Sequence, residues 1–316
     1  MNDNKNEPWR ILLGPQRPQV NLDAAIAKSG IGDAPIAVIS AAWQEAEGDI
    51  GDIQRLVANP LHDLGIYNRA EKIFTADEAL QAAYRQRQDQ LIEQQRMYRL
   101  RLRQLTIAAR EILRVEGNTA AVAEERRHAI SQLRALDRHH LRQTRKIAAR
   151  FAEQFSIESN PLLADHVAAL KKELAGCDTV LITGGHVVVL LNRLSLFGFD
   201  SLLVNKNIIG WSAGAMVLSD RIVLFHDRLP QGRRDPEVMC EGLGIVPDTV
   251  LLPDASGRWR HNDPVRSSLF SRRFSPATCL TIDNGSLLRM QGGKVTDSEG
   301  IQHVTREGKF ALVNTL

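Results

Sequence analysis

The stretch Lys206-Asn-Ile-Ile-Gly-Trp-Ser-Ala-Gly-Ala215 combines a short apolar run with the chemistry of a sharp turn. Residues 206–210 form a short run that includes the β-branched pair Ile208-Ile209, which predicts a buried strand. Residues 213–218 are small and apolar, which predicts a helix. Between them Ser212 stands in a Gly-x-Ser-x-Gly pattern, and small neighbours are what a tight strand-to-helix turn requires. The stretch therefore predicts a strand, a turn that presents Ser212, and a helix.

The same alternation continues on both sides of this stretch. Residues 9–13, 35–40 and 178–183 have the pattern of buried strands, and 21–30, 163–174 and 187–196 that of helices. Alternating strands and helices predict an α/β fold with an open, mostly parallel sheet and helices on both faces. Residues 280–285 and 288–295 predict antiparallel strands with Asn-Gly and Gly-Gly turns.

Residues 77–156 differ from the rest because they are rich in Arg, Gln, Leu, Ala and Glu and contain no proline. One heptad position is held by Tyr84, Leu91, Tyr98, Leu105 and Ile112, and the only strong breaker is Gly117-Asn118. The pattern predicts two long helices, each on the order of 55 Å, in an antiparallel hairpin. We expect 1–76 and 159–316 to be two parts of one α/β domain and 77–158 to be an insertion.

The insertion also carries the positive charge. The chain has a net charge of +3, but residues 81–150 hold 16 Lys and Arg against 7 Asp and Glu. A basic helix can bind phosphates, although no recognised nucleic-acid fold or aromatic stacking platform accompanies this one. Heptad spacing is better explained by helix pairing, so we predict a homo-oligomer formed through the hairpin rather than nucleic-acid binding.

The remaining composition points to a soluble protein. The hydrophobic fraction is 43%, and the three cysteines are far apart with no Cys-x-x-Cys pair. This predicts neither a disulfide framework nor a metal site, and we expect no cofactor. The first residues are polar and no apolar run approaches about 20 residues, so we expect a cytoplasmic protein without a membrane span.

Ser212 is the strongest candidate for chemistry. A strained turn holds the hydroxyl clear of the backbone and aims the amide of Ala213, near a helix N-terminus, at a developing oxyanion. The competing interpretation is a Gly/Ala-rich junction with an incidental serine.

A second candidate is Thr183-Gly184-Gly185-His186 at the end of a predicted strand. Open α/β domains bind ligands at this edge of the sheet, and a diglycine allows close approach of the backbone. The Gly185 amide is then a second oxyanion donor; the alternative is a plain glycine turn.

Taken together, residues 183–186, Gly210–Ala215 and the string Glu241-Gly-Leu-Gly-Ile-Val-Pro247 resemble the serine peptidase family of dipeptidase E and cyanophycinase. The resemblance covers 162–300 well and 9–76 weakly, and the helical hairpin has no counterpart in it. It implies a class I glutamine amidotransferase-like fold. It also implies Ser212 as nucleophile, Gly185 and Ala213 as oxyanion donors, and Asp227 as the acid of the triad.

The sequence departs from this family at the general base. Where the family has histidine, this chain has Asp254 or Ala255. A serine hydroxyl needs a base within about 3 Å. We nominate His261, because a loop of seven residues spans up to about 23 Å. The alternatives are His226, which adjoins Asp227 but points to the other face of a strand, and His186.

Arginines surround the same loop, at Arg258, Arg260 and Arg266. Family substrates carry a free carboxylate, which guanidinium groups hold bidentately; the alternative is a solvated basic loop. The first hypothesis is a serine hydrolase that cleaves a peptide or isopeptide-like amide bond of a small peptide through an acyl-enzyme on Ser212. The second is an inactive family member that acts as an oligomeric scaffold through its helical arm.

Overall fold

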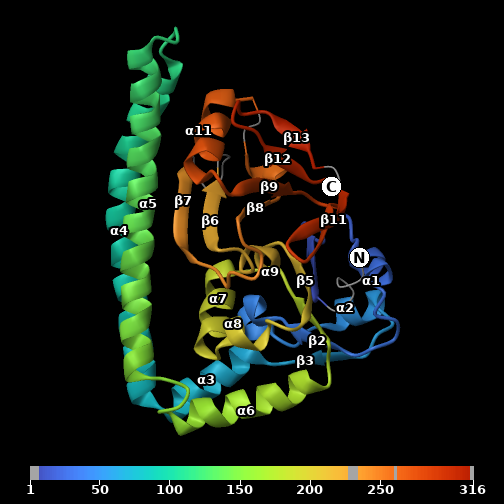
Figure 1. The fold of residues 1–316 in the computed structure, drawn as a ribbon. Coiled ribbons are helices and arrows are strands. Elements are labelled where there is room, and N and C mark those ends of the chain that lie inside the picture. Colours follow the sequence, from blue (N-terminus) through green and yellow to red (C-terminus); the bar gives the residue numbers. More distant parts are fainter. Residues whose placement is uncertain (1–6, 227–233, 260–261, 314–316) are drawn as a thin grey trace.

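The computed structural model describes residues 7–226, 234–259 and 262–313, and a seven-stranded sheet forms its centre (Figure 1). The strand order is β11-β10-β1-β5-β4-β2-β3. The strands β1, β5, β4, β2 and β3 run parallel, whereas β10 and β11 add antiparallel pairs at one edge. This confirms the predicted open, mostly parallel sheet. The bounds are β1 (Trp9–Leu13), β2 (Ile36–Ile39), β3 (Leu61–Asp63), β4 (Thr179–Ile182), β5 (Asn207–Trp211), β10 (Leu287–Gln291) and β11 (Lys294–Glu299).

Helices cover both faces of this sheet, because the apolar residues of its strands point alternately to each side. In β2, Ala37 and Ile39 join one core, and Ile36 and Val38 join the other. The first core is completed by α3 (Ile66–Ala76), α6 (Pro161–Ala175) and α7 (Val187–Leu196). The second is completed by α1 (Leu22–Ser29) and α2 (Gly51–Leu56).

A second sheet and a two-stranded ribbon follow the parallel core. The sheet has the order β13-β12-β9-β8, and the ribbon pairs β6 with β7. The bounds are β6 (Arg221–His226), β7 (Arg234–Glu241), β8 (Thr249–Pro253), β9 (Thr278–Ile282), β12 (Gln302–Val304), β13 (Phe310–Leu312) and α11 (Pro264–Phe274). The short helices are η1 (Ala41–Ala46), α8 (Phe199–Leu202), α9 (Ala213–Met216) and α10 (Ala255–Arg258).

One predicted pairing is wrong. The strands on either side of Asn284-Gly285 do not form a hairpin, since β9 lies in the second sheet and β10 pairs with β1. The Asn284 side chain instead donates to the carbonyls of Pro15 (2.6 Å) and Gln19 (2.7 Å), which ties this crossing to another loop. The turn at Gly292-Gly293 does join the antiparallel strands β10 and β11, as predicted.

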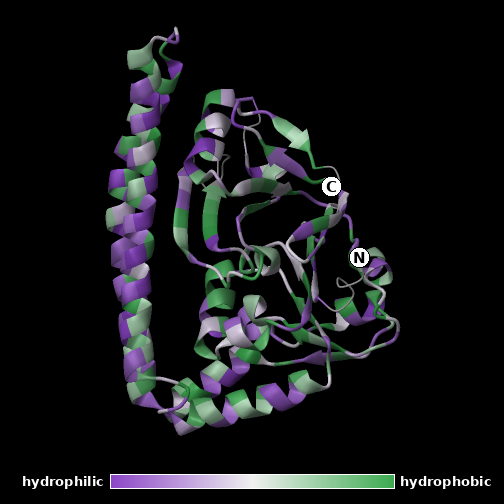
Figure 2. Ribbon diagram, in the orientation of Figure 1, coloured by the Kyte–Doolittle hydropathy of each residue, from purple (hydrophilic) through white to green (hydrophobic). Residues whose placement is uncertain are grey.

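The basic segment forms two long antiparallel helices, α4 (Glu78–Arg114) and α5 (Ala120–Gln154), which we call the arm. Asp77 caps α4 by accepting from the Leu80 amide, and Thr119 caps α5 by accepting from the Val122 amide. The arm runs beside β7 and α11, and its loop end projects beyond the body (Figure 1). Its residues are far more hydrophilic than those of the parallel strands (Figure 2).

The apolar stripe of the arm packs on the body as well as within the hairpin. Tyr98, Leu102 and Ala109 share one buried cluster with Val238 of β7 and Phe270 of α11. The expectation that the heptad residues serve only helix pairing, within the arm or between subunits, was therefore incomplete. Homo-oligomerisation and the division of the chain at 76 and 158 stay predictions.

A buried polar network fixes the arm to the body. Arg273 of α11 donates from Nε and Nη2 to the two carboxylate oxygens of Asp137 on α5, at 2.7 and 2.6 Å. The same Nη2 donates to the hydroxyl of Tyr98 on α4 (2.6 Å), and that hydroxyl donates to Asp137 (2.9 Å) and accepts from the Val238 amide (3.0 Å). Arg273, Asp137 and Tyr98 are 5%, 4% and 2% exposed. Burial raises the pKa of Tyr98, so the phenol keeps its proton.

Acidic side chains of β7 match part of the arm's positive charge. Glu237 accepts from Arg99 (2.5 Å) and Gln95 (2.9 Å) of α4, and Asp235 pairs with Arg110. Such pairs between partly buried groups are screened less by salt than exposed ones. A share of the arginines that suggested a binding surface therefore serves to dock the arm.

Removing the carboxylate of Asp137 should destabilise the protein strongly, because it leaves the Arg273 guanidinium buried without its counter-charge. We expect Asp137→Ala to lower the free energy of unfolding by about 3–5 kcal/mol in urea denaturation followed by circular dichroism. The matched control is Asp89→Ala on the exposed face of α4, which should change it by less than about 0.5 kcal/mol. Equal stability of the two variants would contradict this account of the arm.

Candidate active site

Ser212 occupies a strained turn directly after the parallel strand β5. Its φ is 50° and its ψ is −112°, a conformation that residues with a side chain rarely adopt and that costs about 1–3 kcal/mol. The Ser212 amide donates to the carbonyl of Leu13 at the end of β1 (3.0 Å). Two neighbouring strands therefore hold this turn at the carboxyl edge of the sheet, where α/β proteins bind ligands.

The glycines around Ser212 are required by close backbone contacts. A Cβ on Gly214 would lie 2.2 Å from the carbonyl oxygen of Ile182, and a Cβ on Gly210 would lie 2.8 Å from that of Gly214. A Cβ on Gly184 would lie 3.0 Å from Cβ of Ser212 and 2.7 Å from the Trp211 ring. The Ser212 turn and the loop after β4 therefore touch each other.

The orientation of the second loop is set by an indole. Nε1 of Trp43 donates to the carbonyl of Gly184 at 2.9 Å. Since the two ends of a trans peptide group point in opposite directions, the amide N–H of Gly185 faces away from that indole. Gly185 itself has φ 139° and packs so closely on Ala42 that a Cβ would lie 2.7 Å from the Ala42 carbonyl oxygen.

Two backbone donors beside the serine have no partner in the described part of the chain. No hydrogen bond joins the amide of Gly185 or that of Ala213 to another residue within the described ranges. For Ala213 this follows from its place in the first turn of α9, where amides have no partner in the helix. Unpaired amides of this kind can receive negative charge on an oxygen.

A cavity of about 1260 Å³ opens at this point, and the half-buried Ser212 lines it with Gly184 and Gly185. Its walls carry the indoles of Trp43 and Trp211. The lining also includes charged and apolar residues that the sequence reasoning missed, among them Arg17, Asp49, Asp52, Arg55, Val20, Leu22, Ile53 and Leu56. Trp43 comes just after a predicted strand, at the edge of the sheet where ligands bind, and this position was the signal that could have found it.

His186 follows the second loop but serves as a helix cap. Its ring Nδ1 accepts from the amide of Val189 at 3.3 Å, at the start of α7. A neutral ring that accepts at Nδ1 carries its proton on Nε2, and so it has no lone pair left for a serine proton. This geometry argues against His186 as the base.

Asp254, where the resemblance expects a histidine, holds a turn of its own. It adopts a left-handed conformation (φ 58°, ψ 41°) at the end of β8, and Ala255 beside it is fully buried. Its carboxylate pairs with Arg258 at 3.2 Å. Arg258 is not among the described residues that line the cavity at Ser212. Arg266 is 2% exposed and pairs with Asp235 at 3.5 Å, so the expectation that it lies in a substrate-binding loop was wrong.

Asp283 connects that turn to the site, and the sequence reasoning did not single it out. Its carboxylate accepts from the Ser256 amide (2.8 Å). Its carbonyl oxygen lies 1.8 Å from where a Cβ on Gly14 would be, and Gly14 follows the residue that accepts from Ser212. An acid directly after a buried strand, at the ligand-binding edge of a sheet, was the signal that could have found it.

Several predicted site residues lie outside the described ranges. These are Asp227, Arg260 and His261, and the side chain of His226 is also not described. Their roles therefore stay predictions. Within the described ranges, no histidine lines the cavity at Ser212.

The three cysteines are weaker candidates for the nucleophile than Ser212. Burial raises the pKa of Cys177, and it raises those of Cys240 and Cys279 to about 12, so all three stay protonated near neutral pH.

Within the described ranges, no three His, Cys, Asp or Glu residues are grouped as a metal site would need. Among the described helices, none combines the length and apolar character that crossing a bilayer requires.

Comparison with known proteins places these features in a family. The sequence model of peptidase family S51 matches residues 138–297, half of the chain, including both glycine loops and Ser212. Curated proteins give no match. The solved structures that are similar include a peptidase from an acI-B1 actinobacterium, with 12% identity over 98% of this chain and 95% of that one at a TM-score of 0.47. Another is a protein assigned to peptidase E from Listeria monocytogenes EGD-e, with 12% identity over 93% and 98% at a TM-score of 0.45. The match to the family model shows that the chain belongs to peptidase family S51.

Proposed function

We propose that this protein is a serine peptidase in which Ser212 attacks the carbonyl carbon of an amide bond. The observation that carries the proposal is the strained turn, which sets the half-buried serine in the wall of a large cavity beside two unpaired amides. In the reaction Oγ bonds to the carbonyl carbon while its proton passes to a base. The base then gives the proton to the departing amine as the C–N bond breaks, and water later hydrolyses the acyl-enzyme.

The amides of Gly185 and Ala213 are proposed to stabilise the tetrahedral oxyanion. Fixed donors that need no reorganisation contribute strongly to such a step, and loss of one typically costs about 10²–10³ in rate. The Trp43 indole supports this role because it fixes the peptide group whose N–H belongs to Gly185. The short helix α9 adds further donors from its first turn.

His261 is proposed as the base and Asp227 as the acid that orients it. His186 is the weaker choice because its Nδ1 caps α7. The family membership supports a serine peptidase, and the base assignment rests on the sequence.

The substrate is proposed to be a small peptide or a related isopeptide-like amide. The cavity offers both signs of charge, with Asp52 paired to Arg17 (3.5 Å) and to Arg55. It also offers apolar surface from Trp43 and Trp211. The charged groups suit the amino and carboxylate groups of a small peptide, and the apolar surface suits its side chains. A carboxylate bound by Arg260 fits the same substrate class, whereas Arg258 already holds Asp254. A cytoplasmic location fits the three unpaired cysteines.

A second candidate is a non-catalytic member of the family that acts as a scaffold. The observation that favours it is the turn at Asp254 and Ala255, where the resemblance expects the base. In that case the arm, rather than Ser212, carries the function, and the cavity binds without turnover.

Covalent labelling separates the two candidates. A fluorophosphonate probe should label the intact protein, because the activated hydroxyl attacks phosphorus and the oxyanion donors receive its oxygen. Ser212→Ala should abolish labelling, while Ser195→Ala on the exposed surface of α7 should keep it, as measured by gel fluorescence and mass spectrometry. A well-folded protein that stays unlabelled would refute the catalytic proposal and favour the scaffold.

The rate of labelling tests the base. His261→Ala should lower the second-order rate constant by about 10² or more, the usual contribution of a general base. His303→Ala on β12 provides the matched control and should leave the rate within about twofold. An unchanged rate in His261→Ala would eliminate that histidine but leave the nucleophile assignment intact.

The turn itself is tested with a single methyl group. Gly214→Ala should lower the free energy of unfolding by about 1–3 kcal/mol and abolish labelling, since its Cβ would meet the Ile182 carbonyl. Alanine is otherwise the better helix former, so the sign of the effect depends on that contact. The control is Gly51→Ala in α2, where a Cβ meets nothing within 4 Å and stability should not fall. Full labelling of Gly214→Ala would show that the close contact is unnecessary.

A further inference from the structure

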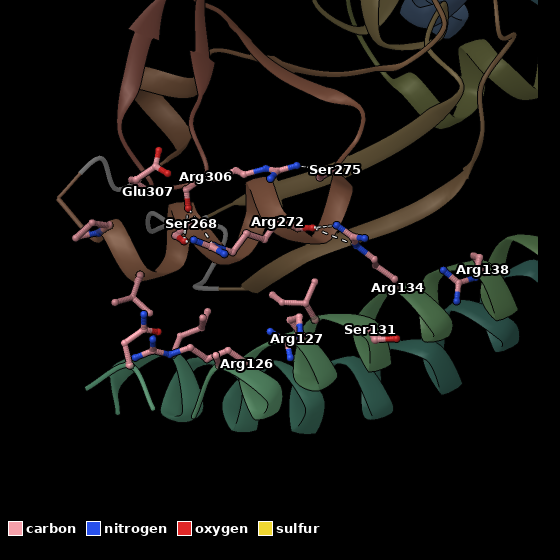
Figure 3. A pocket seen from close by; sticks show the side chains of 16 residues that line it. Arg126, Arg127, Ser131, Arg134, Arg138, Ser268, Arg272, Ser275, Arg306 and Glu307 are labelled. Atoms are coloured by element: carbon pink, nitrogen blue, oxygen red, sulfur yellow. Dashed lines mark hydrogen bonds between the residues drawn. The ribbon is translucent and has the colours of Figure 1, made fainter. Parts of the chain in front are cut away.

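A second cavity, of about 810 Å³, lies between the loop end of the arm and the body. Among the described residues, six arginines and one glutamate line it, and Figure 3 shows Arg126, Arg127, Arg134 and Arg138 on the arm, with Arg134 reaching across to Arg272 on the body. The other lining residues are small, polar or apolar: Leu113, Asn118, Ala123, Ile130, Ser131, Pro264, Val265, Ser268 and Ser275. Among the residues that the structure describes, the cavity shares none of its lining with the one at Ser212.

The arginines here differ from those that dock the arm. Farther along the arm, Arg99 and Arg110 are neutralised by the β7 acids Glu237 and Asp235. In the cavity, within the described ranges, only Arg127 has a carboxylate within ion-pair distance, that of the exposed Glu124 one turn away. The positive charge of this cavity is therefore not needed to hold the arm in place.

Neutral acceptors orient several of these guanidinium groups. Arg134 donates from Nε to the carbonyl of Arg272 at 3.2 Å, and Arg272 donates from Nε to the Ser268 hydroxyl and the Arg306 carbonyl, both at 3.1 Å. Arg306 donates to the Ser275 hydroxyl at 3.3 Å (Figure 3). These contacts hold the side chains but leave their charge uncompensated. A ligand then meets cations that are already in position, which lowers the entropy cost of binding.

The cations repel one another. Burial lowers the pKa of Arg134, and the neighbouring charges of Arg138 and Arg306 lower it further. The charged form of Glu307 is favoured instead: hydrogen bonds from its own backbone and from Thr305 lower its pKa, and Arg272 and Arg306 lower it further. One carboxylate does not balance six guanidinium groups, so an anion that enters the cavity relieves this repulsion.

The chemistry of the lining selects the anion. Guanidinium groups bind phosphoryl oxygens bidentately, and the hydroxyls of Ser131 and Ser275 can donate further hydrogen bonds. Because the cations stand on two facing walls, a single phosphate cannot contact them all, whereas a chain of phosphoryl groups spans the gap. We propose that this cavity binds a small oligophosphate, such as inorganic triphosphate or the triphosphate of a nucleotide.

A nucleic acid fits the cavity less well. Within the described ranges no aromatic side chain lines the cavity, so bases find no stacking platform there. The arginines are gathered in one hollow between arm and body, whereas a nucleic acid requires a track of cations along its backbone.

The test is isothermal titration calorimetry of the full chain with inorganic triphosphate, with ATP and with a 20-nucleotide single-stranded RNA. We expect saturable triphosphate binding that weakens with salt. Arg138→Gln on the arm and Arg306→Gln on the body should each weaken it by about tenfold, the effect of one charge-assisted contact. Arg101→Gln on the exposed face of α4 removes the same charge elsewhere and should change it by less than about twofold.

Each outcome decides the proposal. Equal binding of triphosphate and ATP identifies the phosphoryl chain as the recognised group, and tighter binding of ATP identifies a nucleotide. Absence of saturable triphosphate binding at low salt overturns the proposal, and so does an equal loss in Arg101→Gln. RNA binding that triphosphate does not compete would assign the basic surface to a nucleic acid instead. Circular dichroism of the two cavity variants checks their folding. Loss of binding in only one of the two folded variants would mean that only the arm or only the body binds the ligand, which would contradict the proposal.

Discussion

The site depends on how closely three stretches of backbone approach one another at the end of the parallel sheet. Gly184, Gly210 and Gly214 meet carbonyl groups or side chains at distances that leave no room for a Cβ. Because these positions are bare, the chain can turn within one residue from β5 into α9 and carry Ser212 at a positive φ. The conformational cost of that turn is offset by the packed sheet around it, whose strands β1, β4 and β5 are buried on both faces. A rigid scaffold thus holds a strained residue in a fixed place.

The position of the arm depends on a small set of buried polar groups. Its helices carry too much charge for a core, yet Tyr98 and Asp137 are buried because Arg273 and the β7 backbone satisfy them. Buried polar groups of this kind are stabilising only when every partner is present, and here each links a different element. The network therefore specifies where the arm lies as well as holding it. The arginines nearer the loop end bind no carboxylate of the body within the described ranges, and Arg134 reaches the body through a neutral carbonyl, so their charge is available to a ligand.

Local pattern predicted the parallel sheet, both helical layers and the arm, because each depends on periodicity within a few residues. It also predicted the turn at Ser212, because the glycines of Gly-Trp-Ser-Ala-Gly are the small residues that a tight strand-to-helix turn requires. Pairing across the chain was not predictable in this way: Asn284 looked like a hairpin turn but binds the loop at Pro15. The docking of Arg273 on Asp137, 136 residues away, leaves no local signal either. Trp43 comes just after a predicted strand and Asp283 lies near the end of one, positions that mark them as candidates, but the contacts that give them their roles are made only on folding.

The proposed reaction requires the turn to hold Ser212 beside the amides of Gly185 and Ala213. A crystal structure of the protein after reaction with a fluorophosphonate tests this arrangement. We expect a bond from Ser212 Oγ to phosphorus, with the phosphoryl oxygen about 2.7–3.1 Å from both amide nitrogens. An adduct whose phosphoryl oxygen points into solvent, away from both amides, would contradict it.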